Sequence, residues 1–501
     1  MNNWHFDTKM VQVFVVLLVL FSVNSGYSQN PERRGQKKGP YQEGRNDRPP
    51  GKSRVEKVAN GNIILGSPTS NSITASVILE KDGEAFLEYS TGNGQQKNKT
   101  AVCKSMDGEP LKIVLKNLTP NTIYSYCLNY RLPGEKQFRQ SSVSWFSTQK
   151  KYGGTFSFGV QGDSHPEREG KMFNPLLYLQ TLDSVSQRRP DFYFMMGDDF
   201  SIDKLLVNNQ TNKENVERVY LNQLSWLGNA GKMPPIFLVN GNHEQAAKYL
   251  LDGSANNPAV LAANARKKYF PLPDPGDFYG GNRDTVAHVG YLKDYYSFEW
   301  GNALFIVIDP YWHSDIPVDN QPGTQEKKNR KDPWGITLGD VQYNWFKNTL
   351  EKSRAKFKFV FSHHVLGTGR GGIENARLFE WGGLDRDGTS QFAKNRPTWA
   401  MPIHQLMVKN KVTIFFQGHD HLFARQELDG IIYQSVPNPA DDTYTAFNRD
   451  AYTSGVILPN SGFLYITVNS AEVKVNYVRS WLKDSPALTD EAKKSYSYII
   501  N

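Results

Sequence analysis

Short apolar runs that each end in a polar residue recur along residues 150–482, and this pattern predicts buried strands. Runs this short and this continuously apolar are typical of central strands that are covered on both faces. The segments between them, such as LLYLQTLDSVSQRR and NVERVYLNQLSWLG, carry apolar residues at helical spacing. We therefore expect an α/β domain that holds its functional side chains at the carboxyl ends of its strands. Five runs follow one plan: TFSFGVQGD, DFYFMMGDD, PIFLVNGNHE, KFVFSHH and VTIFFQGHDH.

Residues 58–149 show a different pattern, in which apolar and polar residues alternate over short runs such as SITASVIL and EAFLEYST. Turn-forming DGE and GNG separate these runs, so the segment predicts a small all-β sandwich ahead of the α/β domain. Three longer stretches of the α/β domain are rich in Gly, Pro, Trp and Tyr, and we expect them to be insertions at the mouth of the site. These stretches are residues 245–295, 310–340 and 365–400.

The N-terminus carries the apolar run MVQVFVVLLVLFSV, followed by small and polar residues in NSGYSQ. This layout predicts a secretory signal peptide over residues 1–28, cut after Ser28. An uncleaved membrane anchor is the alternative, although the run is shorter than a membrane span usually needs. We therefore expect a secreted, periplasmic or extracellular protein with no transmembrane segment after cleavage of the signal.

The net charge of +8 is concentrated in residues 29–57, where nine Lys or Arg stand against four Asp or Glu. This stretch is rich in Pro and Gly and lacks periodicity, so it predicts a disordered basic linker. The rest of the chain is close to neutral, and a specific nucleic-acid partner is therefore not expected. Nucleic-acid binding through the linker remains an alternative. Residues 483–501 are assigned to a C-terminal tail.

The chain has two cysteines, Cys103 and Cys127, both inside the predicted sandwich. In the oxidising compartment that a signal peptide implies, a disulfide between them is expected. Two unpaired thiols are the alternative.

The polar residues at the ends of the five runs suit metal binding. Imidazole nitrogens mixed with carboxylate and amide oxygens favour Zn, Fe or Mn. Seven such ligands are too many for one ion, and they suit two ions about 3.5–4 Å apart that share a carboxylate. Glycines beside these residues permit sharp turns and close backbone approach. The polar residues are Asp163, His165, Asp198, Asn242, His243, His363, His419 and His421, and all of them except His243 are counted as the seven ligands.

In order along the chain, the motifs D-x-H, G-D, G-N-H-E, H and G-H-x-H resemble those of the calcineurin-like metallophosphoesterase superfamily. The preceding sandwich resembles the fibronectin-III-like domain of purple acid phosphatases. The resemblance implies a four-layer α/β fold, in which a two-sheet β-sandwich is flanked by helices and is preceded by the small all-β domain. It also implies that Asp420, between the last two histidines, is directed away from the metals.

The resemblance further assigns roles to the motif residues. Asp198 would bridge the two ions, and His243 would face the substrate as general acid or transition-state stabiliser. The two ions would activate a water for in-line attack on phosphorus. The first ion would be held by Asp163, His165 and His421, and the second by Asn242, His363 and His419.

Two positions need a choice or depart from the family. Of the adjacent histidines in SHH, His363 is taken as the ligand because it comes first after the strand, and His364 is left as a substrate contact. Arg370, in the loop that follows, is a second candidate substrate contact. In purple acid phosphatases an iron-binding tyrosine stands where this chain has Ser201, and glycine replaces His165. The site should therefore lack their tyrosinate.

These patterns predict an exported hydrolase of phosphoric esters that uses two metal ions and acts on a small-molecule phosphoester. A phosphomonoesterase is favoured, and a phosphodiesterase or nucleotidase is the alternative. A catalytically inactive binding or adhesion protein, in which the sandwich does the work, is an alternative of another class. The complete ligand set argues against it. The sequence does not determine the oligomeric state.

Overall fold

The computed structural model describes residues 61–501 apart from Glu80, 93–96, Asp107, 230–232, 319–331 and 366–368. The predicted signal peptide and basic linker lie outside these described residues. Within the described part, no helix combines the length and apolar character needed to cross a bilayer.

The first described region, residues 62–147, is all-β, as the alternating pattern predicts. One of its sheets runs β1-β2-β6, and the other is built around the long antiparallel pair β3 and β7. An apolar core that includes Ile73, Leu87 and Leu128 fills the region. Its strands are β1 Asn62–Gly66, β2 Ile73–Ile78, β3 Gly83–Thr91, β4 Asn98–Lys99, β5 Cys103–Ser105, β6 Leu111–Leu115, β7 Ile123–Arg131, β8 Arg139–Gln140 and β9 Ser144–Ser147.

The predicted disulfide is wrong, because Cys103 and Cys127 are both free thiols. β3 lies between the strands that carry them: Ala85 pairs with Cys103 on β5, and Glu88 pairs with Cys127 on β7. Two strands separated by a third lie about 10 Å apart, which exceeds the reach of a disulfide. Both cysteines fall within one sheet, and sequence spacing alone could not reveal the strand between them.

The larger part of the chain is built on two sheets that pack face to face. In the first sheet β10, β11 and β12 are parallel neighbours. In the second sheet β17, β18, β19 and β21 are parallel neighbours. The first sheet runs β12 Ile236–Leu238, β11 Phe192–Met195, β10 Phe156–Gln161, β23 Gly462–Val468, β24 Val473–Arg479 and β25 Tyr496–Ile500. The second runs β13 Gly280–Gly281, β16 Tyr296–Trp300, β17 Ala303–Val307, β18 Phe357–Phe361, β19 Ile414–Gln417, β21 Ile431–Ser435, β20 Phe423–Leu428 and β22 Val456–Leu458.

Aromatic side chains fill the space between the two sheets. Phe192 and Phe194 of β11 point into this core with Phe305 of β17 and Phe361 of β18, and the rings of Phe194 and Phe361 stack with centroids 4.1 Å apart. Successive strand residues face opposite sides, so the neighbouring Tyr193 packs on the outer face instead. Stacked and edge-on rings add about 0.5–1.5 kcal/mol per pair beyond area burial. This core fixes the two sheets, and therefore their loop ends, relative to each other.

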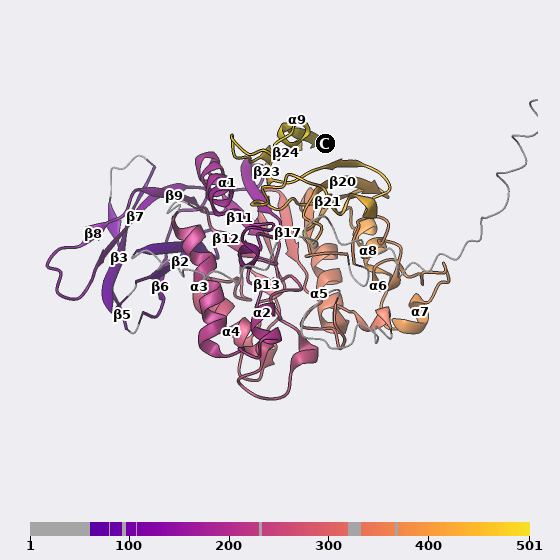
Figure 1. The fold of residues 1–501 in the computed structure, drawn as a ribbon, viewed down its shortest axis with the longest axis horizontal. Coiled ribbons are helices and arrows are strands. Elements are labelled where there is room, and N and C mark those ends of the chain that lie inside the picture. The colour runs from indigo at the N-terminus through magenta and orange to yellow at the C-terminus, as the bar shows by residue number, and fades with distance from the viewer. Residues whose placement is uncertain are drawn as a thin grey trace, which may run out of the picture. The chain divides into compact units, whose positions relative to one another are not determined.

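Helices cover both outer faces, which gives the four layers that the resemblance implies. Figure 1 shows α1 and α3 on one side of the strands and α5 and α8 on the other. The apolar residues of α1, α3 and α4 pack on the first sheet, and those of α5 and α8 pack on the second. The helices are α1 Pro175–Arg188, α2 Asp203–Val207, α3 Lys213–Asn229, α4 Pro258–Tyr269, α5 Gly339–Lys352, α6 Phe379–Gly382, α7 Phe392–Asn395, α8 Ile403–Lys409 and α9 Asp490–Lys493.

Residues 483–501, assigned to a C-terminal tail from the sequence, contribute to the fold. β25 pairs antiparallel with β24 over Tyr496–Ile500 and extends the first sheet. The alternating residues of YSYII give the reason, since Tyr496, Tyr498 and Ile500 pack on the core between the sheets. The alternation extends over only five residues after a short helix, so it is a weak signal in the sequence.

The all-β region packs directly on the helical face of the first sheet. Asn62 Nδ2 donates to the carbonyl of Leu224 in α3 at 2.8 Å, and Tyr279 Oη donates to the carbonyl of Pro68. Gly228 of α3 lies so close to Asn62 that a Cβ there would overlap its side chain.

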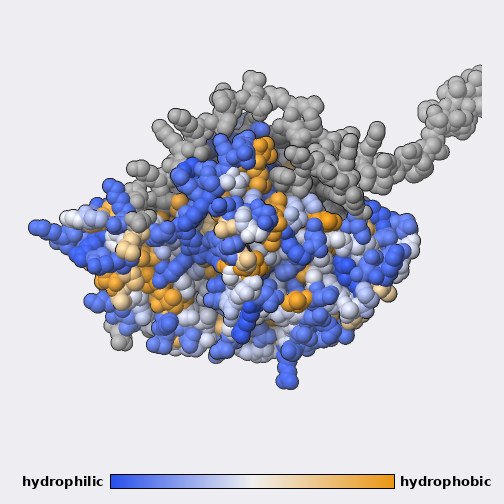
Figure 2. Space-filling model, turned by 90° about the horizontal axis from the view of Figure 1, so that it is seen from below, coloured by the Kyte–Doolittle hydropathy of each residue, from blue (hydrophilic) through white to orange (hydrophobic). Residues whose placement is uncertain are grey.

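The face drawn in Figure 2 is mostly hydrophilic, with apolar residues in small separate patches.

Candidate metal centre

The proposed ligands lie in turns that directly follow buried strands. β10, β11 and β12 deliver one group of ligands, and β18 and β19 deliver the other. The site therefore lies where the carboxyl ends of the two sheets meet, and ligands from both sheets converge on it. The first sheet supplies Asp163, His165, Asp198 and Asn242, and the second supplies His363, His419 and His421.

Four of the seven ligand residues adopt a left-handed backbone. The φ angles are 49° at His165, 58° at Asp198, 67° at His419 and 56° at His421. Non-glycine residues rarely adopt this conformation, and the strain costs of order 1 kcal/mol or more at each residue. All four side chains are buried, so the turns place polar groups inside the protein at some cost.

Two glycines allow the turns to approach each other. A Cβ on Gly418 would lie 2.5 Å from Asp163 Oδ1, and one on Gly241 would overlap Asp198 Oδ1. Any other residue at either position would push a ligand carboxylate out of place. The close approach expected from the sequence is present at both glycines.

Asp163 is fully buried and contacts both groups of ligands. Its Oδ2 lies 3.0 Å from His421 Nε2, 3.8 Å from His363 Nε2 and 4.0 Å from His165 Nε2. The backbone N–H of His419 donates to both carboxylate oxygens, at 2.8 and 3.0 Å. These bonds hold Asp163 of one sheet against the GHDH turn of the other.

Asp198 has an equivalent position. Its Oδ2 lies 3.2 Å from His363 Nε2, 3.6 Å from His165 Nε2 and 3.7 Å from His243 Nε2. Its Oδ1 accepts from the backbone N–H of His243 at 2.9 Å. One oxygen is thus held by the protein, while the other faces the histidines from both sheets.

The donor set fits metal ions. His165 Nε2, Asn242 Nδ2 and His421 Nδ1 are buried and have no hydrogen-bond partner within the described residues. Buried polar atoms are normally satisfied, and an ion beside His165 Nε2 would satisfy that atom. Asp163 and Asp198 each belong to two of the overlapping groups whose ligand atoms lie within 4.8 Å of one another. These groups are Asp163, Asp198, His363 and His419; Asp163, His165 and His421; and His165, Asp198 and His243.

Hydrogen-bond contacts at Nδ1 orient two of the imidazoles. Glu167 Oε1 lies 2.9 Å from His165 Nδ1, and the carbonyl of Met196 accepts from His363 Nδ1 at 2.7 Å. With Nδ1 engaged, Nε2 of each ring faces the carboxylates and is the nitrogen that would bind an ion. Asn242 Oδ1 lies 3.1 Å from His363 Nε2, which places the amide oxygen in the same group.

The electrostatics of the cluster depend on carboxylates and imidazoles buried together. Burial opposes ionisation of Asp163 and Asp198, but the surrounding histidines, His363 foremost among them, together outweigh it and lower the pKa of both carboxyls. Burial also opposes protonation of His363, but the two carboxylates raise its pKa to about 10. His165 differs, because burial and then the charge of Arg168 lower its pKa. His165 is therefore a neutral imidazole, the form that binds metals.

Glu244, the last residue of GNHE, holds two ligand turns together. Its carboxylate accepts from the backbone N–H groups of Asp199 at 2.8 Å, Phe200 at 3.2 Å and Gly241 at 2.5 Å. Burial, followed by the charge of Asp198, raises the pKa of Glu244 to about 7. The sequence motif includes this residue, but its role in joining the turns depends on contacts that only the fold reveals.

His243 lies beside the cluster with its Nε2 3.7 Å from Asp198 Oδ2. Its Nδ1 hydrogen-bonds the Asp203 carboxylate, and its Nε2 lies 3.1 Å from Arg168 Nη2. Burial opposes protonation, but the carboxylates of Asp198 and Asp203 outweigh it and raise the pKa of His243. Sequence reasoning missed Asp203 and Arg168, which lie outside the five motifs.

Arg370 and Asp420 form a pair behind the GHDH turn. Arg370 Nη1 donates to the carbonyl of His419 and lies 3.2 Å from Asp420 Oδ1. Asp420 Oδ2 accepts from the N–H of Gly371 at 2.8 Å and from Tyr452 Oη at 2.6 Å. Asp420 thus points away from the ligand atoms, as expected. Arg370 contacts the backbone of a ligand turn.

His364 is buried beside the second ligand group. Its ring stacks on Tyr311 with centroids 5.9 Å apart, and Tyr311 Oη lies 3.4 Å from His364 Nδ1. The centroid of the His419 ring lies 4.9 Å away. The structure therefore brings His364 close to the cluster, next to a proposed ligand.

Comparisons with known proteins agree with this geometry. The family model described as Calcineurin-like phosphoesterase matches residues 156–423, which is more than half of the chain. No curated protein matches the chain in sequence. Among solved structures, PhoD is similar with a TM-score of 0.59 and 14% identity, over 84% of this chain and 86% of PhoD. The purple acid phosphatase PPD1 from yellow lupin (Lupinus luteus) is similar with a TM-score of 0.52 and 16% identity, over 87% of this chain and 73% of its own. At such identities the likeness concerns the fold.

Proposed function

The chain belongs to the calcineurin-like phosphoesterase family, and we propose that it is an exported hydrolase of phosphoric esters that acts with two metal ions. The observation that carries the proposal is the set of overlapping Asp and His groups at the seam of the two sheets, all of them buried except His243. Asp163, His165 and His421 would hold one ion, and Asn242, His363 and His419 the other, with Asp198 shared. Zn, Fe and Mn all suit these nitrogen and oxygen donors.

Two bound ions would neutralise the phosphoryl charge and activate the attacking water. The chain's own residues fix the geometry. Glu244 holds the turns of Asp198 and Asn242 together, and Glu167 turns His165 Nε2 toward the carboxylates. Ser201 occupies the place of the purple acid phosphatase tyrosine, so we propose a site without a tyrosinate ligand.

His243 is the proposed proton donor to the leaving group. In hydrolysis the water oxygen forms a new bond to phosphorus, the ester P–O bond breaks, and the leaving oxygen takes a proton. With Nδ1 on Asp203, His243 can deliver that proton only from Nε2, the atom that faces the cluster. The carboxylates of Asp198 and Asp203 raise the pKa of His243, which favours its protonated form.

Within this reaction class we propose a phosphomonoesterase that acts on a small molecule. Hydrolysis of diesters or nucleotides would use the same cluster and differ in what the surrounding loops accept. Export is proposed from the signal-like apolar run in residues 1–28. An inactive binding protein is the opposing function, and the retention of all seven ligand residues speaks against it.

Hydrolysis of p-nitrophenyl phosphate beside bis-p-nitrophenyl phosphate tests the proposal, with Mn, Zn or Fe supplied to the protein. Release from the monoester that requires added metal supports it. Preference for the diester would replace the monoesterase with a phosphodiesterase. Absence of release from both, with no metal bound, would overturn the enzyme assignment in favour of the binding protein.

A further inference from the structure

Arg168 places a guanidinium at the edge of the cluster, outside the five motifs. It ends the short 3-10 helix Pro166–Arg168, which follows directly on the ligand His165. Its backbone N–H donates to the carbonyl of His165 at 2.9 Å. Because the carbonyl of Asp198 accepts from the N–H of His165 at 3.2 Å, Arg168 is tied through backbone hydrogen bonds to two ligand turns.

The side chain of Arg168 is held in place but not covered. Nε lies 3.2 Å from Glu167 Oε1, Nη1 lies 3.1 Å from Met172 Sδ, and Nη2 lies 3.1 Å from His243 Nε2. The side chain retains 30% of its accessible surface. A guanidinium has five N–H donors, and the contacts with Glu167 and Met172 use two of them. When His243 carries the proton at Nε2 that it would donate, this nitrogen cannot accept from Nη2, so the other three N–H groups, on the two terminal nitrogens, are available to a substrate oxygen.

A comparison with Arg370 separates two kinds of arginine near the cluster. Arg370 contacts the carbonyl of His419 and the carboxylate of Asp420, both parts of the turn itself. Arg168 contacts the ring of His243 at Nε2, the atom that also faces Asp198 Oδ2 at 3.7 Å. Arg370 therefore braces a ligand turn, whereas Arg168 lies beside the proposed proton donor His243.

We propose that Arg168 binds a phosphoryl oxygen of the substrate and makes the site prefer phosphomonoesters to diesters. This inference rests on the proposed function. A phosphomonoester has three non-bridging oxygens and nearly two negative charges at neutral pH. In a diester one of these oxygens carries a second ester group, so one charge is lost. The third oxygen of the monoester is the acceptor that suits the free N–H groups of Arg168, in a charge-assisted pair.

The test compares Arg168→Ala and Arg168→Lys with wild type, each loaded with the same metal. Arg218→Ala is the matched control, since Arg218 is an exposed arginine on α3 that pairs with Glu214. We expect Arg168→Ala to lower kcat/KM for p-nitrophenyl phosphate about 10–100-fold and to change bis-p-nitrophenyl phosphate hydrolysis less than about 3-fold. Arg168→Lys should fall between wild type and Ala, because it keeps the charge and loses the planar fork. Arg218→Ala should match wild type.

Inorganic phosphate binding, measured by calorimetry on the same metal-loaded proteins, gives a readout that does not need turnover. Arg168→Ala should weaken phosphate binding about 10–100-fold with unchanged metal content and melting temperature. Equal losses on both esters, or loss of metal, would overturn the proposal and make Arg168 a brace for His165 and His243. Unchanged phosphate binding would also overturn it. If wild type hydrolyses neither ester, the proposed function fails, while phosphate binding still decides the role of Arg168.

Discussion

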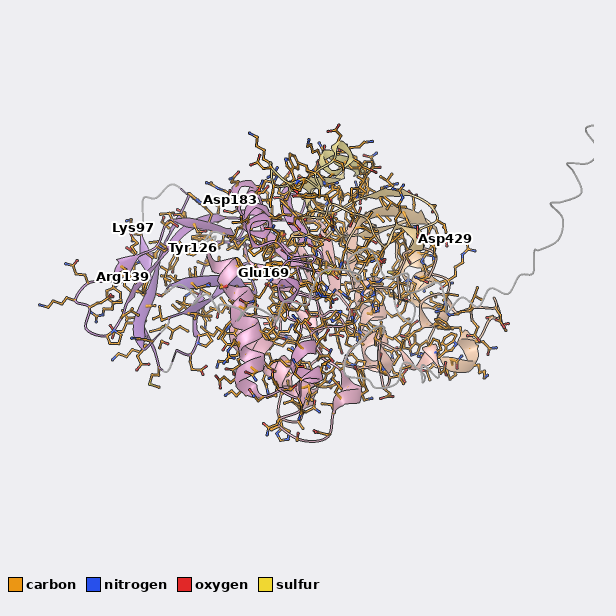
Figure 3. The ribbon with its side chains drawn as sticks, in the orientation of Figure 1. Lys97, Tyr126, Arg139, Glu169, Asp183 and Asp429 are labelled. Atoms are coloured by element: carbon orange, nitrogen blue, oxygen red, sulfur yellow. The ribbon has the colours of Figure 1, made fainter. Side chains whose placement is uncertain are left out.

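The all-β region at residues 62–147 and the two-sheet sandwich that follows it both bury an apolar core, but their strands end differently. Among the described residues of the first region, the left-handed residues other than glycine are Ser67, Asn117 and Asn121, none of them buried. These are small polar residues at or near the surface, where such a backbone serves only to reverse the chain. Tyr126 lies inside this region and Arg139 at its outer end (Figure 3).

In the second sandwich the left-handed residues at the strand ends include four buried ligands of the proposed metal centre, His165, Asp198, His419 and His421. Backbone strain combined with burial of polar groups is costly, and two bound ions that these residues share between them would offset it. The difference shows that two-sheet packing alone does not make a site. The buried, strained turns at the seam of the sheets make it.

The largest loss of activity should come from replacing one ligand residue at the seam of the two sheets. We expect Asn242→Ala and His421→Ala each to lower turnover at least about 1,000-fold, or about 4 kcal/mol of barrier, while the domain stays folded. Arg139→Ala, at the outer end of the all-β region, should leave turnover unchanged. Steady-state rates and circular dichroism check both statements. Near-wild-type rates in the two ligand variants would contradict the assignment.

The next effect is a loss of metal affinity at Glu244, whose carboxylate accepts hydrogen bonds from backbone N–H groups of two ligand turns. Glu244→Gln keeps the size of the side chain but weakens its bonds to the turns of Asp198 and Asn242, and we expect metal affinity to fall about 10–100-fold. Glu135 also accepts a backbone N–H, from Leu132 in the all-β region at 2.9 Å. Glu135→Gln should leave metal affinity unchanged. Metal titrations that show the same affinity for both variants would contradict the role given to Glu244.

A smaller loss of stability is expected where the all-β region packs against α3. Gly228→Ala would overlap the side chain of Asn62, and overpacking of this kind costs about 1–3 kcal/mol. Gly92→Ala, whose Cβ would meet only the carbonyl of Ile123 at 3.8 Å, is the control. Denaturant unfolding should show lower stability for the first variant and not the second. A stability loss that is equal in both would contradict the close packing at Gly228.

The last effect is a pH dependence of stability that belongs to the two-sheet domain. No Asp or Glu among the described residues of 62–147 is buried, whereas Asp309 is, and burial followed by the charge of Asp294 raises its pKa to about 6. The folded state then holds the proton more tightly than the unfolded state, so this contribution is present below about pH 4 and is lost as pH rises through about 6. Asp309→Asn should flatten the stability curve in that window by about 1.4 kcal/mol per pKa unit. An unchanged curve from denaturant unfolding at pH 4–7 would contradict this.

The sequence predicted the strands that carry ligands because the two signals, an apolar run and the polar residues that follow it, are both local. A short apolar run followed by Gly and a His or Asp is visible within ten residues, as at Asp163 and His419. The order of these motifs also pointed to the family and to its four layers. The structure places six of the seven proposed ligands in the overlapping groups around Asp163 and Asp198. The seventh, Asn242, has its Oδ1 3.1 Å from His363 Nε2.

The features that the sequence could not predict depend on contacts between residues far apart in the chain or on the order of the strands in a sheet. Arg168 and Asp203 contact His243 from outside its motif, 75 and 40 positions away. The expected disulfide failed because β3 separates Cys103 from Cys127, and no feature of the spacing records that strand. The role of β25 was missed because five alternating residues are a weak signal at the end of a chain.

Metal content per chain tests the central claim most directly. Wild type, His421→Ala and Asn242→Ala are each loaded with excess Zn, Mn or Fe, freed of unbound ions and analysed by plasma mass spectrometry, with Arg139→Ala as control. The account predicts about two ions per chain in wild type and control, and about one in each ligand variant. Fewer than about one ion per chain in wild type, or two in both ligand variants, would contradict the two-metal centre.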